Sequence, residues 1–109
     1  MKPLLPSLRE KKRYVVFEVI SKEKLSVMPE KDIEESMLKL HGEIGLGNAG
    51  LIYLKNKWNK RIQRGIIKVH HKYVDKLRAA LCSMNNRGAI IKSVGVSGIL
   101  KKAEEKYLG

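Results

Sequence analysis

The stretch RYVVFEVIS, residues 13–21, carries the clearest secondary-structure signal in the sequence. It is rich in β-branched and aromatic residues, and consecutive side chains of a strand point to opposite faces of a sheet. The residues predicted to face a helix-covered core are Val15, Phe17 and Val19. The residues predicted on the second face are Tyr14, Val16, Glu18 and Ile20. Because Tyr14, Val16 and Ile20 would form an apolar patch, we expect a protein partner to cover part of that face.

The segment after this strand predicts a helix that starts at Pro29. Proline is tolerated in the first turn of a helix, and the carboxylates of Glu30 and Asp32 complement the helix dipole. Apolar residues then recur at helical spacing, namely Ile33, Met37, Leu40 and Ile44. The glycines of HGEIGLGNAG, residues 41–50, interrupt this pattern, so we predict a compact turn region there.

The rest of the chain predicts a hairpin, a second helix, a fourth strand and a short final helix. The hairpin strands are residues 51–56 and 62–70, joined by the polar segment KWNKR. The second helix spans residues 72–84, with Val74, Leu77, Leu81 and Met84 along one stripe, and a turn at residues 85–88 leads to a strand at residues 89–97. The final helix is ILKKAEEKYL, with Leu100, Ala103 and Tyr107 on one side. This order is typical of an α+β, ferredoxin-like (RRM-like) β-α-β-β-α-β sandwich, in which two helices cover one side of a four-stranded antiparallel sheet.

Length and composition predict one domain at residues 13–109, preceded by a basic, proline-containing arm at residues 1–12. A chain of 109 residues with 43% hydrophobic content can bury one modest core. Cys82 is alone and follows an apolar helical pattern, which predicts a small buried core residue and excludes an intramolecular disulfide. The start of the sequence has prolines and charges where a signal sequence would be apolar, so we expect a cytoplasmic protein without membrane contact.

The charge distribution predicts a polyanionic partner. Lys and Arg total 23 against 11 Asp and Glu, which gives a formal charge of +12. Between Ile44 and Ala103 there are 13 basic residues and a single acid, Asp75, whereas most other acids lie between Glu10 and Glu43. We favour RNA over a membrane surface because no basic amphipathic helix lies beside a hydrophobic anchor. A lysine-rich solubilising surface is the other explanation, but mixed charges would serve that purpose with less self-repulsion.

An RNA partner should be held through phosphates and shape. The strand that begins Arg64-Gly65 has the first two residues of an RNA-recognition pattern, but aliphatic residues follow where aromatic ones would stack on bases. The cations predicted to contact RNA are Lys11, Lys12, Arg13, Lys57, Lys60, Arg61, Arg64 and Lys68. Trp58, at the hairpin tip, could stack on a base, insert into a partner or fold back over its own strands, and we favour the last two equally.

No catalytic or metal-binding motif is evident in the sequence. His41, His70 and His71 are the only histidines, and adjacent strand residues point to opposite faces, so we predict no metal site. The glycine-rich stretch lacks the Gly-Lys-Ser/Thr of a phosphate-binding loop and follows a predicted helix instead of a strand. We therefore expect no cofactor bound by the protein and no nuclease activity of the protein alone.

Four segments, in this order, resemble the archaeal ribonuclease P protein component 2 family, the counterpart of a eukaryotic subunit shared by ribonucleases P and MRP. The segments are PSLREKKRYVVFEVIS, GEIGLGNAGLIYLK, VHHKYVDKLRAAL and VGVSGILKKAEEKYL. They span almost the whole chain, which makes the resemblance specific. The hairpin KNKWNKRIQRG is more basic than the family pattern, and His70 with His71 replaces an Asn-Arg pair that is frequent there.

The resemblance implies a non-catalytic subunit that binds ribonuclease P RNA, a ribozyme that removes the 5′ leader of precursor tRNA. Mg²⁺ is then expected in the active site of the RNA, and the partners are protein component 3, a barrel-type protein, and the other protein subunits. Neutralising phosphates would let RNA helices approach one another and lower the Mg²⁺ that folding requires.

Two other functions of this fold are alternatives. The first is a homodimeric regulatory or small-ligand-binding module, which would not explain the charge of +12. The second is an acylphosphatase-like enzyme, which needs an arginine in the loop before the first helix. In this chain that loop, SKEKLSVMP at residues 21–29, has lysines and no arginine.

Overall fold

A computed structural model describes residues 11–83 and 90–108. The elements are β1 (Lys12–Ile20), α1 (Glu30–Ala49), β2 (Ile52–Tyr53), β3 (Arg64–His70), α2 (Val74–Ser83), β4 (Ile90–Ser97), α3 (Leu100–Ala103) and the π-helical turn η4 (Glu104–Leu108), with 3-10 turns η2 (Lys55–Lys57) and η3 (His71–Tyr73). The sheet order is β2-β3-β1-β4 and every pairing is antiparallel. The predicted ferredoxin-like fold is confirmed. Most of the predicted arm, Met84 and the turn at residues 85–88 lie outside the described residues.

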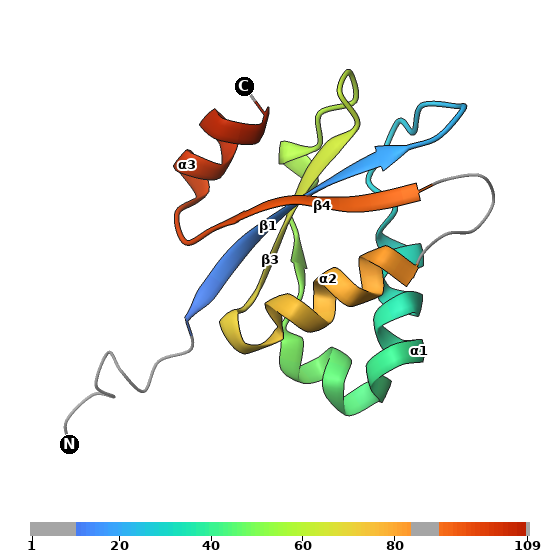
Figure 1. The fold of residues 1–109 in the computed structure, drawn as a ribbon, viewed down its shortest axis with the longest axis vertical. Helices are drawn as coiled ribbons and strands as arrows, with labels where there is room; N and C mark the ends of the chain where they lie inside the picture. Colours follow the sequence, from blue (N-terminus) through green and yellow to red (C-terminus); the bar gives the residue numbers. More distant parts are fainter. Residues whose placement is uncertain (1–10, 84–89, 109) are drawn as a thin grey trace.

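The main core lies between one face of the sheet and the helices α1 and α2, which both pack on that side (Figure 1). The predicted core residues of β1 are all buried there, namely Val15, Phe17 and Val19. They pack with Ile33 and Met37 of α1 and with Leu77 and Leu81 of α2. Each such side chain contributes roughly 1.5–3 kcal/mol by leaving water, so this layer holds the sheet and the helices together.

The C-terminal helix covers part of the second face of the sheet, opposite α1 and α2 (Figure 1). Val16, Ile66 and Ala103 are fully buried there, and Leu100 and Tyr107 pack against them, as predicted for this helix. A Cβ at Gly95 would lie 2.1 Å from the Tyr107 ring, so the ring needs a glycine beneath it.

The predicted apolar patch on this second face is therefore wrong in part. Val16 is buried by the chain's own C-terminal helix, and Tyr14 is half-buried against the same cluster. Only Ile20, at the end of β1, is widely exposed, with 46% of its surface accessible. A protein partner could cover Ile20 and its strand neighbour Ile90, but not the centre of the sheet.

The predicted turn region at residues 41–50 is helical instead. Helix α1 continues to Ala49, with a kink at Gly42 (φ 74°, ψ 177°), and ends at Gly50 in the left-handed conformation (φ 57°). Because the kink turns the second half of the helix, Ile44 is 81% exposed, and Leu40, which precedes the kink, is also 49% exposed. Ala49 is buried in their place. Cys82 is also exposed, contrary to the prediction of a core residue.

Candidate nucleic-acid interface

The eight cations predicted to contact RNA lie in two groups at opposite ends of β3. In the β1–β3 pairing, Lys12 lies opposite His70, whereas Glu18 lies opposite Arg64. With a rise of about 3.3 Å per residue, these two ends are roughly 20 Å apart. We call Lys11, Lys12, Arg13 and Lys68 the strand-start group, and Lys57, Lys60, Arg61 and Arg64 the hairpin group. The two groups are therefore separate.

Two cations of the hairpin group are bound to acidic residues of the protein. Arg64 donates to Glu18 at 2.8 Å and to the carbonyl oxygen of Tyr107 at 2.9 Å. The Nζ atom of Lys57 lies 2.7 Å from a carboxylate oxygen of Glu104, which begins η4. Since both cations tie the C-terminal helix to the sheet, their first role is structural.

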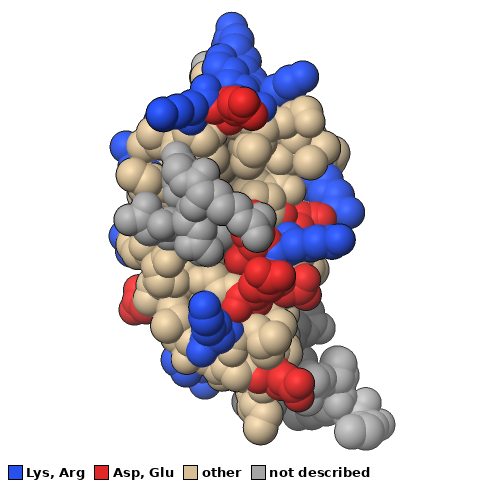
Figure 2. All heavy atoms as spheres, turned by 90° about the vertical axis from the view of Figure 1, so that its right-hand side faces the viewer, with Lys and Arg blue, Asp and Glu red and all other residues tan. Residues whose placement is uncertain are grey.

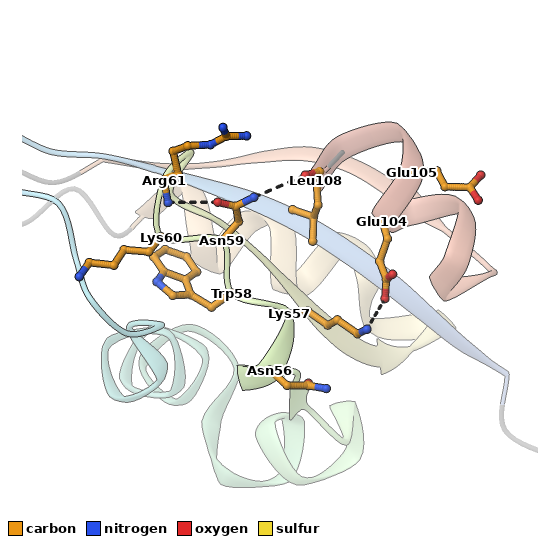
Figure 3. A pocket seen from close by; sticks show the side chains of 9 residues that line it. All are labelled: Asn56, Lys57, Trp58, Asn59, Lys60, Arg61, Glu104, Glu105 and Leu108. Carbon is orange, nitrogen blue, oxygen red and sulfur yellow. Dashed lines mark hydrogen bonds and ion pairs between the residues drawn. The ribbon is translucent and has the colours of Figure 1, made fainter.

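Lys60 and Arg61 remain exposed at the hairpin tip, and neither side chain forms an ion pair within residues 11–83 and 90–108. Figure 3 shows Lys57 directed toward Glu104, whereas Lys60 extends away from the C-terminal helix. Of the hairpin group, these two cations are the most available to phosphates.

The hairpin holds its shape through side-chain amides. Oδ1 of Asn59 accepts from the backbone N–H groups of Arg61 and Ile62, at 3.1 and 3.3 Å, an arrangement that stabilises turns. Gln63 has a positive φ of 56° and is only 6% exposed. Its side chain accepts from the N–H of Leu25 and donates to the carbonyl oxygens of Leu25 and Lys60. These bonds fix the backbone from which Lys60 and Arg61 project.

Replacing Gln63 with alanine is expected to lower the free energy of unfolding by about 1–3 kcal/mol. The backbone groups of Leu25 and Lys60 would lose their partners, while the strain of a positive φ would be the same for alanine as for glutamine. Urea denaturation would measure the change. The control is Asn56→Ala, which also removes a side-chain amide, but from an exposed position. Equal stabilities of the two variants would contradict this role of Gln63.

Trp58 folds back over its own strands, which was one of the two positions expected for it. Its ring stacks on Phe17 with centroids 6.1 Å apart and an interplanar angle of 27°. A Cβ at Gly65 would lie 2.9 Å from both rings. Arg64 and Gly65 resemble the start of an RNA-recognition pattern, but both have structural roles here. Arg64 forms an ion pair with Glu18, and Gly65 leaves room for the rings of Phe17 and Trp58.

A shallow groove separates the hairpin from the C-terminal helix (Figure 3). Lys57, Lys60 and Arg61 line one side, and Glu104 and Glu105 line the other. The two carboxylates would repel a phosphate placed between the walls. We therefore expect backbone contacts of RNA on the outer side of the hairpin tip and not inside this groove.

The strand-start group lies beside a set of aromatic rings. Lys68 Nζ is 5.9 Å from the centroid of the Tyr14 ring, and Lys11 is exposed. His70 and His71 do not point to opposite faces as predicted, because His71 already belongs to η3, and their rings stack with centroids 4.7 Å apart. Within the described residues, no group of three or more His, Cys, Asp or Glu side chains could hold a metal ion.

Acidic residues gather on helix α1, where Glu30 forms an ion pair of 3.2 Å with Lys55 of η2. The acids of this helix are Glu30, Asp32, Glu34, Glu35 and Glu43. Figure 2 shows acidic side chains together on the side of the molecule that carries α1. Burial, together with Glu34 and Glu30, raises the pKa of the Tyr53 hydroxyl far above its ordinary value, as expected beside negative charge. The acids of α1 outnumber its lysines, Lys31 and Lys39, so this helix is less favourable to a polyanion.

None of the helices in the described ranges has the length and the apolar composition that would be needed to cross a membrane.

Comparisons with known proteins give a consistent result. A family model described as "Rpp14/Pop5 family" matches residues 13–108. The chain is similar to the Ribonuclease P protein component 2 of Pyrococcus abyssi, with 35% identity over 99% of this chain and 93% of the relative. It is also similar to the protein of the same name from Methanosarcina mazei, with 38% identity over 99% of this chain and 93% of the relative. For the protein of that name from Archaeoglobus fulgidus, the identity is 33% over 99% of this chain and 98% of the relative.

Proposed function

The chain belongs to the Rpp14/Pop5 family, and on this premise we propose that it is a protein component of ribonuclease P that binds and stabilises the catalytic RNA. The observation that carries the proposal is the separation of charge over the fold. Exposed cations lie at both ends of β3, whereas the acids are concentrated on α1. One side of the molecule is therefore suited to a polyanion and another is not.

The proposed role of the protein is to neutralise phosphates where RNA helices come together. Neutralisation by protein cations replaces condensed counterions, so the folded RNA would need less Mg²⁺ to reach its active form. The Mg²⁺-dependent removal of the 5′ leader of precursor tRNA would then be chemistry of the RNA. The protein's contribution would be the geometry and charge of its surface.

We further propose that component 3 and other protein subunits bind alongside the RNA. An apolar pair is available for such a contact at the end of the sheet, where Ile20 lies opposite Ile90, with 46% and 50% of their surfaces exposed. Both β-strand residues belong to the second face of the sheet, beyond the part that the C-terminal helix covers.

The test is a reconstitution of precursor tRNA cleavage with ribonuclease P RNA and the remaining protein subunits, with and without this chain. We expect this chain to lower the Mg²⁺ concentration at half-maximal cleavage, and we expect the purified protein alone to cleave nothing. Correctly placed cleavage by the protein without RNA would contradict the proposal. An unchanged Mg²⁺ requirement on adding the protein would contradict it as well.

A further inference from the structure

Three rings lie close together where β3 ends and η3 begins. They belong to His70, His71 and Tyr73. The His70 and His71 rings stack at 4.7 Å with an interplanar angle of 26°, and His70 meets Tyr73 edge-on at 6.1 Å. Tyr14 lies opposite Lys68 in the β1–β3 pairing, two positions from His70.

The backbone holds the two imidazoles in place. Nδ1 of His70 accepts from the N–H of Lys72 at 3.2 Å, which caps the first turn of η3. The N–H of His71 donates to the carbonyl oxygen of Lys11 at 2.8 Å, and its Nδ1 lies 3.1 Å from the same oxygen. The rings are thus oriented before any ligand arrives, which reduces the entropy lost on binding.

These imidazoles are not needed to fill the core. Tyr73 packs partly against the main apolar cluster and Tyr14 against the cluster of the second face, but His70 and His71 belong to neither. Both histidines are partly exposed. The two rings stack on each other, so a planar partner at the surface would meet the accessible outer part of this stacked pair.

Cations surround the rings. Lys68 Nζ is 5.9 Å from the Tyr14 centroid, and Lys76 Nζ is 4.8 Å from the Tyr73 centroid. Lys11 and Lys72 are exposed beside the imidazoles, and Asp75, in the first turn of α2, is the only acid near them in sequence. Flat rings that alternate with cations are the combination that binds unpaired nucleotides, because bases stack on the rings while phosphates meet the cations.

We propose that this ring cluster binds unpaired nucleotides of RNA by base stacking on His70 and its neighbours, an inference that rests on the RNA-binding role proposed above. The usual stacking positions of this fold, on the central strands, are not available. Ile66 and Ile67 are aliphatic and fully buried, and the C-terminal helix covers Ile66. The end of β3 supplies instead the rings that the centre of the sheet lacks.

The experiment compares the wild-type protein with two double variants. His70→Asn with His71→Asn removes both rings, but an asparagine at position 70 can still accept the N–H of Lys72. His70→Phe with His71→Phe keeps two flat rings. Affinities for a ten-nucleotide single-stranded RNA, and for an abasic strand of the same length, are measured by fluorescence anisotropy over a range of salt concentrations. Circular dichroism melting of each variant checks that it folds.

For the single-stranded RNA, we expect the asparagine variant to bind roughly 5- to 100-fold more weakly than wild type, as loss of one stacked base would cause. We expect the phenylalanine variant to bind within about twofold of wild type. On the abasic strand all three proteins should bind alike. The slope of log affinity against log salt should not change, because the lysines remain.

Equal binding of the single-stranded RNA by wild type and the asparagine variant would overturn this inference alone. The same would follow from an equal loss on the abasic strand, because that loss could not come from bases. If the wild-type protein bound neither strand, the proposed RNA-binding function would fail, and this inference with it.

Discussion

Replacement of Ile33 by alanine is expected to lower the free energy of unfolding by about 2–5 kcal/mol, whereas the same replacement at Ile44 should change it by less than about 0.5 kcal/mol. Both isoleucines belong to α1 and both fit the apolar spacing of the sequence. Ile33 is fully buried in the main core, but Ile44 is 81% exposed. The difference follows from the cavity that would form at the first site and not at the second.

Urea denaturation of the two variants and the wild type provides the measurement, because a change in midpoint at constant slope reports stability alone. For a domain whose total stability is about 5–15 kcal/mol, the Ile33→Ala effect would be a large fraction of it. A large loss for Ile44→Ala would mean that α1 does not turn at Gly42 and that Ile44 packs in the core. The prediction thus tests the kink as well as the core.

Strand β1 was predictable because burial has a simple period in it, whereas the strand predicted at residues 51–56 is limited to Ile52–Tyr53 and Lys55–Lys57 form the 3-10 turn η2. Val15, Phe17 and Val19 occupy alternate positions of β1 and therefore share one face, and a sheet with helices on that side must bury this set. The order of the elements then limits the topology to few arrangements. The final helix was predictable for a similar reason, since Leu100, Ala103 and Tyr107 form one apolar side.

The kink in α1 was not predictable, because glycine is compatible with both helix and turn. Gly42 has a left-handed φ, whereas Gly45 and Gly47 continue the helix after it. Sequence spacing places Ile44 on the buried side of a straight helix, and the observed change of direction at Gly42 moves it to the surface. Several closely spaced glycines do indicate that a helix axis can change, but not where.

The pairing of charges also lay beyond the sequence. Lys57 and Glu104 are far apart in the chain and meet only because the C-terminal helix returns over the second face of the sheet. Arg64 and Glu18 meet because β1 and β3 are neighbours in register. A list of basic residues therefore overestimates the cations available to RNA until such pairs are known.

These pairs determine which hairpin cations should matter most for RNA binding. Replacing Lys60 and Arg61 with alanine is expected to reduce the slope of log affinity against log salt by about 1.4–1.8, because each lost phosphate contact contributes about 0.7–0.9. Over the decade between 1 M and 0.1 M salt, the same loss corresponds to roughly 25- to 60-fold weaker binding at 0.1 M. Folding should be little affected, since exposed charges at a hairpin tip contribute little to stability.

Lys57→Ala serves as the matched control in the same hairpin. Its ammonium group is already 2.7 Å from Glu104, so its loss should change the salt slope less than the loss of either exposed cation. In reconstituted ribonuclease P, the Lys60→Ala, Arg61→Ala variant should need more Mg²⁺ for half-maximal cleavage, and Lys57→Ala should stay close to wild type. If the double variant is folded and keeps the wild-type slope and Mg²⁺ requirement, the hairpin tip does not contact RNA. The strand-start group would then have to provide the phosphate contacts.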